Sequence, residues 1–240
     1  MNRRYCLGIA SVLYFLCFVA FCGQIAYTFE LIELTHSVKI VSDAVSVISG
    51  FTASFFYCLT LNEKKANAFM RRVLFLLFVF YIIMLVDFTL IDDNFGRNIF
   101  NFLSWDRKAF AEYLNTSTNF IPFATVKLFI NGYVKDYLSF WDTSLNLLGN
   151  FLVFMPFTFF TAIFFYKPRP YLKMFFTVLI ATVAIEFLQL LFLTGSTDID
   201  DLILNTSGAM LCYYVLHKKR ISKVIRWLTF GVWDNEKEED

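Results

Sequence analysis

Six long apolar stretches follow one another along the chain, separated by short polar segments and by one long one. Each stretch is close to the roughly 20 residues that an α-helix needs to cross the hydrocarbon core of a membrane. The pattern predicts an all-α, polytopic integral membrane protein with about six transmembrane helices. The predicted spans cover residues 7–29, 40–61, 73–91, 145–166, 174–194 and 199–216.

Two connections constrain how these helices are arranged. The fifth and sixth spans are joined only by the segment from Gly195 to Asp198, so they must form an antiparallel hairpin. Between the third and fourth spans, Pro122 is suited to a helix start, and apolar residues follow it at helical spacing. We therefore expect an amphipathic helix along the outer membrane interface. Its apolar face consists of Phe123, Val126, Ile130, Tyr133, Val134 and Tyr137.

The distribution of lysine and arginine predicts the orientation of the spans. With the amino terminus inside, cytoplasmic segments hold 15 of the 21 basic residues, which agrees with the positive-inside rule. Both termini are therefore expected in the cytoplasm. The 15 are Arg3, Arg4, Lys64, Lys65, Arg71, Arg72, Lys167, Arg169, Lys173, Lys218, Lys219, Arg220, Lys223, Arg226 and Lys237.

The composition agrees with the membrane assignment: 58% of the residues are hydrophobic and the mean hydropathy is +0.59, which excludes a cytosolic enzyme. The five cysteines lie in or beside spans, so we expect no extracytoplasmic disulfide framework. We divide the chain into an N-terminal transmembrane hairpin (1–66), a core (67–220) with a long extracytoplasmic loop (92–143), and a cytoplasmic amphipathic segment with an acidic tail (221–240). Basic and apolar residues alternate near Lys223, as in an interfacial helix on anionic lipid, although retention of topology explains the charges equally well.

Polar side chains embedded in the last three spans are the candidate functional site. A carboxylate near the bilayer centre costs roughly 2.5 to 3.5 kcal/mol, so several in one protein require partners, water or a ligand. Helical spacing places them on three stripes that can converge in the outer half of the bilayer. The stripes are Asn146 with Asn150, Glu186 with Gln189, and Asp201 with Asn205, next to Asp200.

Catalytic and structural interpretations of this cluster remain open. Glu186 is the strongest candidate for an acid/base, with Asp200 and Asp201 as further catalytic residues or as ligands of a divalent cation. We expect Asn146, Asn150, Gln189 and Asn205 to bind ligand. The structural alternative is that the aspartates cap the sixth helix and the amides form interhelical hydrogen bonds.

Several motifs resemble the VanZ-like family of integral membrane proteins in order and spacing, over roughly residues 73–216. They are Asn119 to Phe123, Asn146 to Asn150 leading to Pro156, Ile185 to Gln189, and Asp198 to Asp201 followed by Asn205 and Gly208. The resemblance implies a multi-pass protein of the bacterial cytoplasmic membrane, of a type associated with low-level resistance to the lipoglycopeptide teicoplanin. It also adds Asn119 to the ligand-binding candidates. The first two spans are an addition to the usual core.

The chain departs from the family pattern at the turn between the fifth and sixth spans. Family members usually carry an arginine after the turn glycine, where this chain has Ser196. The departure removes the obvious cationic partner of Glu186 and the aspartates.

The leading functional hypothesis is an outer-leaflet polar pocket that binds or modifies an envelope component, such as a lipid-linked cell-wall precursor or a lipoglycopeptide. The first alternative is a membrane-embedded enzyme acting on a lipid-linked (poly)phosphate with Glu186 as acid/base, and the second is a small transporter. We expect membrane lipids but no nucleic acid as partners. The sequence leaves open whether the protein is an enzyme.

Overall fold

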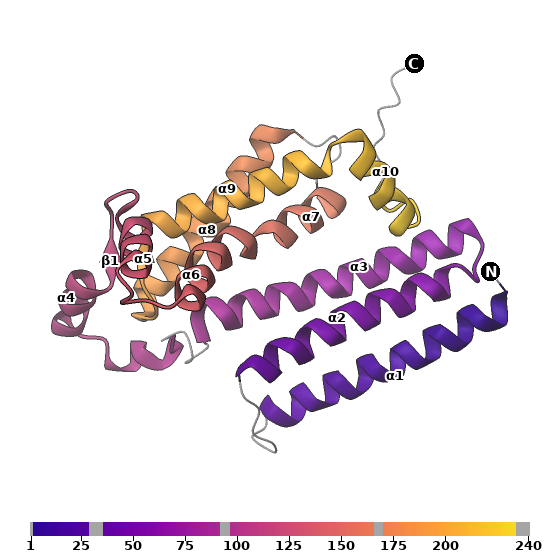
Figure 1. Cartoon of the computed structure of the whole chain (residues 1–240), viewed down its shortest axis with the longest axis horizontal. Helices are drawn as coiled ribbons and strands as arrows, with labels where there is room; N and C mark the ends of the chain where they lie inside the picture. Colours follow the sequence, from indigo (N-terminus) through magenta and orange to yellow (C-terminus); the bar gives the residue numbers. More distant parts are fainter. Residues whose placement is uncertain (1, 29–35, 92–96, 166–169, 234–240) are drawn as a thin grey trace. The chain divides into compact units, whose positions relative to one another are not determined.

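The computed structural model describes residues 2–28, 36–91, 97–165 and 170–233 (Figure 1). These residues form an almost entirely helical protein. The described elements are α1 (Arg3–Thr28), α2 (His36–Cys58), α3 (Glu63–Val86), the π-helix η1 (Asp87–Ile91), the 3-10 helix η3 (Ile99–Ser104), α4 (Arg107–Thr116), β1 (Thr118–Asn119), α5 (Ala124–Val134), α6 (Phe140–Val153), α7 (Met155–Phe164), α8 (Tyr171–Phe192), β2 (Thr197–Asp198), α9 (Ile199–Leu216) and α10 (Lys219–Leu228).

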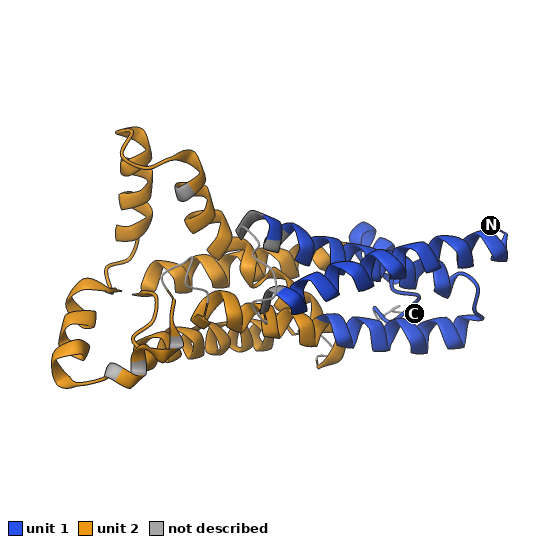
Figure 2. Ribbon diagram, turned by 90° about the horizontal axis from the view of Figure 1, so that it is seen from below, with its two compact units in different colours: residues 1–77, 219–240 blue, residues 78–218 orange. Residues whose placement is uncertain are grey.

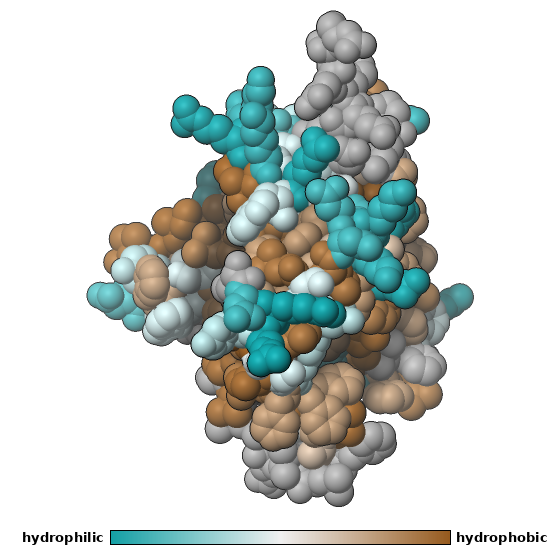
Figure 3. All heavy atoms as spheres, turned by 90° about the vertical axis from the view of Figure 1, so that its right-hand side faces the viewer, coloured by the Kyte–Doolittle hydropathy of each residue, from teal (hydrophilic) through white to brown (hydrophobic). Residues whose placement is uncertain are grey.

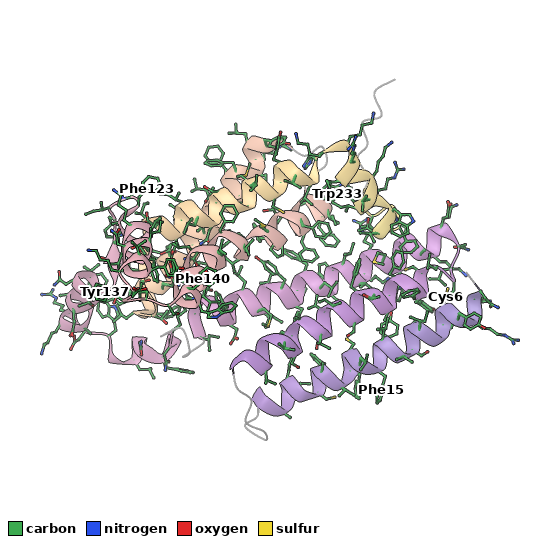
Figure 4. The ribbon with its side chains drawn as sticks, in the orientation of Figure 1. Cys6, Phe15, Phe123, Tyr137, Phe140 and Trp233 are labelled. Carbon is green, nitrogen blue, oxygen red and sulfur yellow. The ribbon has the colours of Figure 1, made fainter. Side chains whose placement is uncertain are left out.

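The predicted membrane class is confirmed. By length and composition, five helical segments could cross a membrane: Arg3–Ala26, Val41–Cys58, Glu63–Ile91, Thr143–Phe164 and Tyr171–Phe192. The predicted sixth span is present as helix α9, but it is not among these five, since Asp200, Asp201 and Asn205 reduce its apolar character. Large apolar side chains remain exposed along the spans, as expected for surfaces that face lipid. Phe15, for example, is 65% exposed and projects away from α1 in Figure 4.

The chain forms two compact units, coloured blue and orange in Figure 2: residues 1–77 with 219–240, and residues 78–218. In the first unit, α1 and α2 pack as a hairpin through small and polar residues. The Tyr14 and Ser54 hydroxyls lie 3.0 Å apart, and the Gln24 amide donates to the Asp43 carboxylate. Buried small side chains such as Ala53 allow the close approach that is typical of helix pairs in membranes.

Helix α10 belongs to this first unit, because the Trp227 ring contacts Phe55 of α2 and the Phe230 carbonyl accepts the Asn67 amide of α3. Phe230 adopts φ 51° and Gly231 φ 79°, which ends the helix. The N–H of Gly231 donates to the Arg226 carbonyl (2.8 Å), and that of Phe230 donates to the Trp227 carbonyl (3.2 Å), the pair of bonds that defines a Schellman motif. The acidic tail predicted after it, residues 234–240, lies outside the described residues.

In the second unit the predicted fourth span is two helices rather than one. Helix α6 ends at Val153 and α7 begins at Met155, because Pro156 lacks the N–H that would continue the helix. The Tyr81 hydroxyl of α3 donates to the carbonyl of Val153, the last residue of α6 (2.7 Å). The break thus leaves this backbone oxygen satisfied inside the unit.

Helices α6, α7 and α8 all pack against α9, which is therefore the centre of the second unit. The closest approach is at Gly208, whose ideal Cβ would lie 1.7 Å from the backbone oxygen of Phe151. Only glycine fits at this crossing. The predicted hairpin of α8 and α9 is present, with Leu193 (φ 51°) and Gly195 (φ 62°) in the turn.

A helix, α5, is present where the interfacial helix was predicted, but it ends at Val134, so Tyr137 of the predicted apolar face lies beyond it. Its apolar residues are not buried by the rest of the chain, since Ile130 is 46% exposed and Val134 is 70% exposed. This exposure is compatible with a position at the membrane surface.

Candidate functional site

A short parallel β-bridge joins the α8–α9 turn to the segment after α4. Thr118 pairs with Thr197 and Asn119 pairs with Asp198. The Thr197 N–H donates to the Ser117 carbonyl at 2.9 Å. The bridge fixes the start of α9, and therefore the aspartates there, relative to the segment between the third and fourth spans.

Asp198 and Asn119 act together at this bridge. The Asp198 carboxylate caps α9 by accepting the Asp200 N–H at 2.8 Å, as the structural alternative predicted. The same oxygen accepts the Asn119 side-chain amide at 3.0 Å. Asn119 also donates to the Thr125 hydroxyl (3.0 Å) and accepts the Ile121 N–H (3.0 Å). Asn119 thus links the start of α9 to the segment that leads into α5.

Asp200 caps a different helix from the one that carries it. One carboxylate oxygen accepts the N–H of Phe123, and the other accepts the N–H of Val126 at 3.0 Å, so Asp200 satisfies the first turn of α5. Phe123, labelled in Figure 4, has φ 64° at this cap. Asp200 is 1% exposed. Sequence reasoning could not find this partner, because 74 to 77 positions separate the residues.

These contacts do not fit the divalent cation suggested for Asp200 and Asp201. Both oxygens of Asp200 already accept backbone N–H groups, which compete for the lone pairs a metal would need. Within the described ranges, no group of three or more His, Cys, Asp or Glu residues could hold a metal ion. The function proposed below therefore does not include a divalent cation at Asp200 and Asp201.

Asp201 pairs with Asn150 across the α6–α9 contact, where the Asn150 side-chain amide donates to the carboxylate. Asn146 lies on the same face of α6 as Asn150, and Asn205 lies on the same face of α9 as Asp201. The side-chain oxygens of Asn146 and Asn205 are buried and have no hydrogen-bond partner among the residues that the structure describes. Two unpaired oxygens thus lie on the stripes that carry the Asn150–Asp201 hydrogen bond.

Glu186 and Gln189 occupy the facing part of α8. The Glu186 carboxylate accepts the Asp198 N–H at 2.9 Å and interacts electrostatically with Asp201. It is partly exposed, whereas Asp201 is buried. The Gln189 amide donates to the Thr89 carbonyl of η1 at 2.9 Å, while its side-chain oxygen is buried without a partner. We call Asn146, Asn150, Glu186, Gln189, Asp201 and Asn205 the polar cluster.

A family model for VanZ/LLP1 matches residues 78–222, more than half of the chain. The chain belongs to the VanZ/LLP1 family. The match includes every residue of the polar cluster, and α1 and α2 precede it, as predicted. Searches of curated proteins and of solved structures found no match.

Within the VanZ/LLP1 region, Arg97 is a cationic residue of the site that sequence reasoning missed. It lies before η3, yet its Nε is 3.2 Å from the ideal Cβ position of Gly195 in the α8–α9 turn. Its guanidinium donates to the Phe88 carbonyl and lies 5.3 Å from the centre of the Phe88 ring. Its charge also acts on Glu186 and Asp201. The guanidinium of Arg97 therefore reaches the turn that contains Ser196.

Tyr113 is the second missed residue of this VanZ/LLP1 site. Its hydroxyl donates to the Thr194 carbonyl at 3.1 Å and lies 3.3 Å from the Thr197 hydroxyl, which ties α4 to the turn. Burial raises the pKa of the Tyr113 phenol above its ordinary value of 10.0, so the phenol stays neutral. No periodicity in the polar α4 sequence indicated this role.

Proposed function

We propose that this VanZ/LLP1 protein binds an envelope component through hydrogen-bond donors that enter the polar cluster. The observation that carries the proposal is the pair of buried, unpartnered oxygens of Asn146 and Asn205. Asn205 is only 6% exposed. Buried polar atoms without partners are rare and cost about 1–3 kcal/mol each, so a ligand that supplied donors would be stabilised there.

The chemistry of the cluster supports a ligand rich in hydroxyl, amide or ammonium groups. Glu186 and Asp201 are carboxylates. Glu186 accepts the N–H of Asp198, and Asp201 accepts the side-chain amide of Asn150. Together with the unpaired amide oxygens they form a surface that mostly accepts hydrogen bonds. The sugar and peptide parts of a lipid-linked cell-wall precursor or of a lipoglycopeptide carry such donors. Low-level teicoplanin resistance through binding of either one is part of this proposal.

The predicted topology is part of the proposal. With both termini in the cytoplasm, the α8–α9 turn faces outward, and the cluster lies in the outer leaflet of the bacterial cytoplasmic membrane. Envelope precursors are consumed on that side.

An enzyme acting on a lipid-linked (poly)phosphate is the second candidate, and the environment of Glu186 favours it over the transporter. Glu186 is partly exposed and is close enough to Arg97 for their charges to interact. A carboxylate beside a guanidinium could move a proton while the guanidinium holds a phosphate.

The test uses full-length variants at matched membrane levels. Glu186→Gln, Asp201→Asn and Asn150→Ala alter the cluster, and Ser207→Ala is the control, since Ser207 is an exposed residue of the same helix α9. Teicoplanin susceptibility, the composition of lipid-linked precursors, and binding of a lipid-linked precursor to the purified variants are measured in parallel. We expect all three cluster variants to lose the wild-type phenotype and Ser207→Ala to keep it.

The pattern of losses separates the two candidates. Loss of precursor conversion only in Glu186→Gln, with binding retained, supports the enzyme. Graded loss of binding in all three supports a binding pocket. Unchanged phenotypes in every cluster variant would overturn both.

A further inference from the structure

The first unit contains an open pocket of about 460 Å³ at the end of α10, a volume within the range of about 300–1,000 Å³ usual for small-molecule sites. All its lining residues belong to that unit, so the pocket is separate from the polar cluster. They are Glu63, Lys223, Arg226, Trp227, Phe230 and Gly231.

The pocket is held by fixed contacts around it. The Asn67 side-chain amide donates to the Phe230 carbonyl at 2.9 Å, which ties the Schellman turn to α3. The ring of Phe55 contacts those of Trp227 and Phe230, with centroid separations of 5.2 and 5.3 Å. The Trp233 indole N–H donates to the Ser222 hydroxyl at 2.9 Å, and Trp233 is fully buried. The walls of the pocket are therefore preorganised.

The position of the pocket is at the edge of the predicted membrane. Glu63 begins helix α3 and precedes the predicted apolar span 73–91, so the pocket lies on the polar side of this membrane boundary. Helix α10 exposes an apolar stripe of Ile221 (40%), Val224 (53%) and Trp227 (63%), at the i, i+3 spacing of one helix face. An exposed apolar stripe flanked by basic residues is typical of a helix lying in the interface.

The charges of the lining residues select an anionic ligand. Lys223 and Arg226 contribute two positive charges against the one negative charge of Glu63. Further charged residues stand close in sequence, the basic Lys64, Lys65, Lys218, Lys219 and Arg220 and the acidic Asp234, Glu236, Glu238, Glu239 and Asp240. Figure 3, which faces this end, shows hydrophilic side chains grouped around apolar surface. Trp227 and Phe230 add apolar walls that suit the glycerol and upper acyl part of a lipid.

We propose that this pocket binds the phosphate headgroup of an anionic phospholipid, with Lys223 and Arg226 at the phosphate and Trp227 beside the upper acyl chains. The site is independent of the polar cluster and of the function proposed for it. It anchors the first unit to one leaflet of the membrane.

The test places the full-length protein in phosphatidylcholine vesicles containing a minority of phosphatidylglycerol, with one of the two lipids brominated. Bromine quenches nearby tryptophan, and subtraction of a Trp227→Phe sample isolates the Trp227 signal from the other three tryptophans of the chain's four. The wild type is expected to be quenched preferentially by brominated phosphatidylglycerol. The double variant Lys223→Gln/Arg226→Gln removes both pocket cations.

The matched control is Lys219→Gln/Arg220→Gln, which removes the same charge from the same helix outside the pocket. We expect the preference for phosphatidylglycerol to fall at least about fivefold in the pocket variant, roughly the effect of one basic residue at an anionic surface, and to stay near wild type in the control. Equal losses in the two variants, or none, would overturn the proposal. Displacement of the lipid by inorganic phosphate would overturn the assignment to a lipid.

Discussion

Gly208 of α9 packs against the backbone carbonyl of Phe151 on α6, so closely that an ideal Cβ would lie 1.7 Å from the oxygen. The contact brings together the two helices that carry Asn150 and Asp201. The hydrogen bond between those side chains depends on this approach. This approach brings together four of the six residues of the polar cluster, because α6 and α9 also carry Asn146 and Asn205.

Gly208→Ala is expected to push α6 and α9 apart. Overpacking of a tight contact typically costs about 1–3 kcal/mol, and here the neighbour is rigid backbone, so we expect the upper part of that range. The measurement is thermal stability in detergent. Gly149→Ala is the control, because Gly149 lies on α6 with nothing within 4 Å of its Cβ position. An equal loss in both variants would contradict the packing argument.

Asp200→Ala is expected to loosen the first turn of α5. The substitution removes the acceptor for the Phe123 and Val126 N–H groups, and loss of such a cap costs about 0.5–2 kcal/mol. Hydrogen exchange at these two amides should accelerate. Asp200→Asn keeps one acceptor oxygen and should show a smaller acceleration. Slow exchange retained in Asp200→Ala would show that the carboxylate does not cap this helix.

Tyr113→Phe is expected to lower stability at neutral pH by about 0.5–1.5 kcal/mol, through loss of a buried hydrogen bond to the turn. The pH dependence of stability follows from the direction in which folding shifts the pKa of Tyr113. Because the pKa of Tyr113 is raised in the folded protein, its contribution is complete below pH 10.0 and is lost as the pH rises through the raised pKa. Melting temperatures measured across the alkaline range should fall more steeply for the wild type than for Tyr113→Phe. Parallel curves would contradict this assignment.

Ser196→Cys tests the predicted orientation. Ser196 is exposed in the α8–α9 turn, so a thiol there should react with a membrane-impermeant reagent. We expect labelling from the extracytoplasmic side of intact cells, with the parent chain as the control for its five native cysteines. Labelling only after the cytoplasm is opened would reverse the topology and move the polar cluster to the inner leaflet.

Much of the fold was predictable because hydrophobic length is a local property. Stretches of about 20 apolar residues have few alternatives to helix in lipid, so the helices corresponding to the predicted spans are present. The fourth predicted span differs from the structure, because Pro156 divides it into the two helices α6 and α7. The hairpin at Gly195 followed from connection length alone, and the family motifs were readable in the same way.

The candidate site was predictable as a set of residues but not as a set of contacts. Spacing placed Asn150 and Asp201 on faces that could meet, and the structure pairs them. The spacing of residues could not show that Asp200 caps α5 or that Arg97 reaches Gly195, because no periodicity links positions so far apart in the chain. Partners of this kind depend on how helices and loops pack in three dimensions.

The sequence by itself determined the membrane class, the helices and the family motifs, because each depends on composition or spacing within one segment. The tertiary structure decided which carboxylates accept hydrogen bonds from the protein itself and which buried polar atoms have no partner among the described residues. Asp200 is used by the backbone of α5, whereas the oxygens of Asn146 and Asn205 have no partner. The cost of a buried polar group depends on whether hydrogen-bonding groups surround it, and those groups come together only when the chain folds.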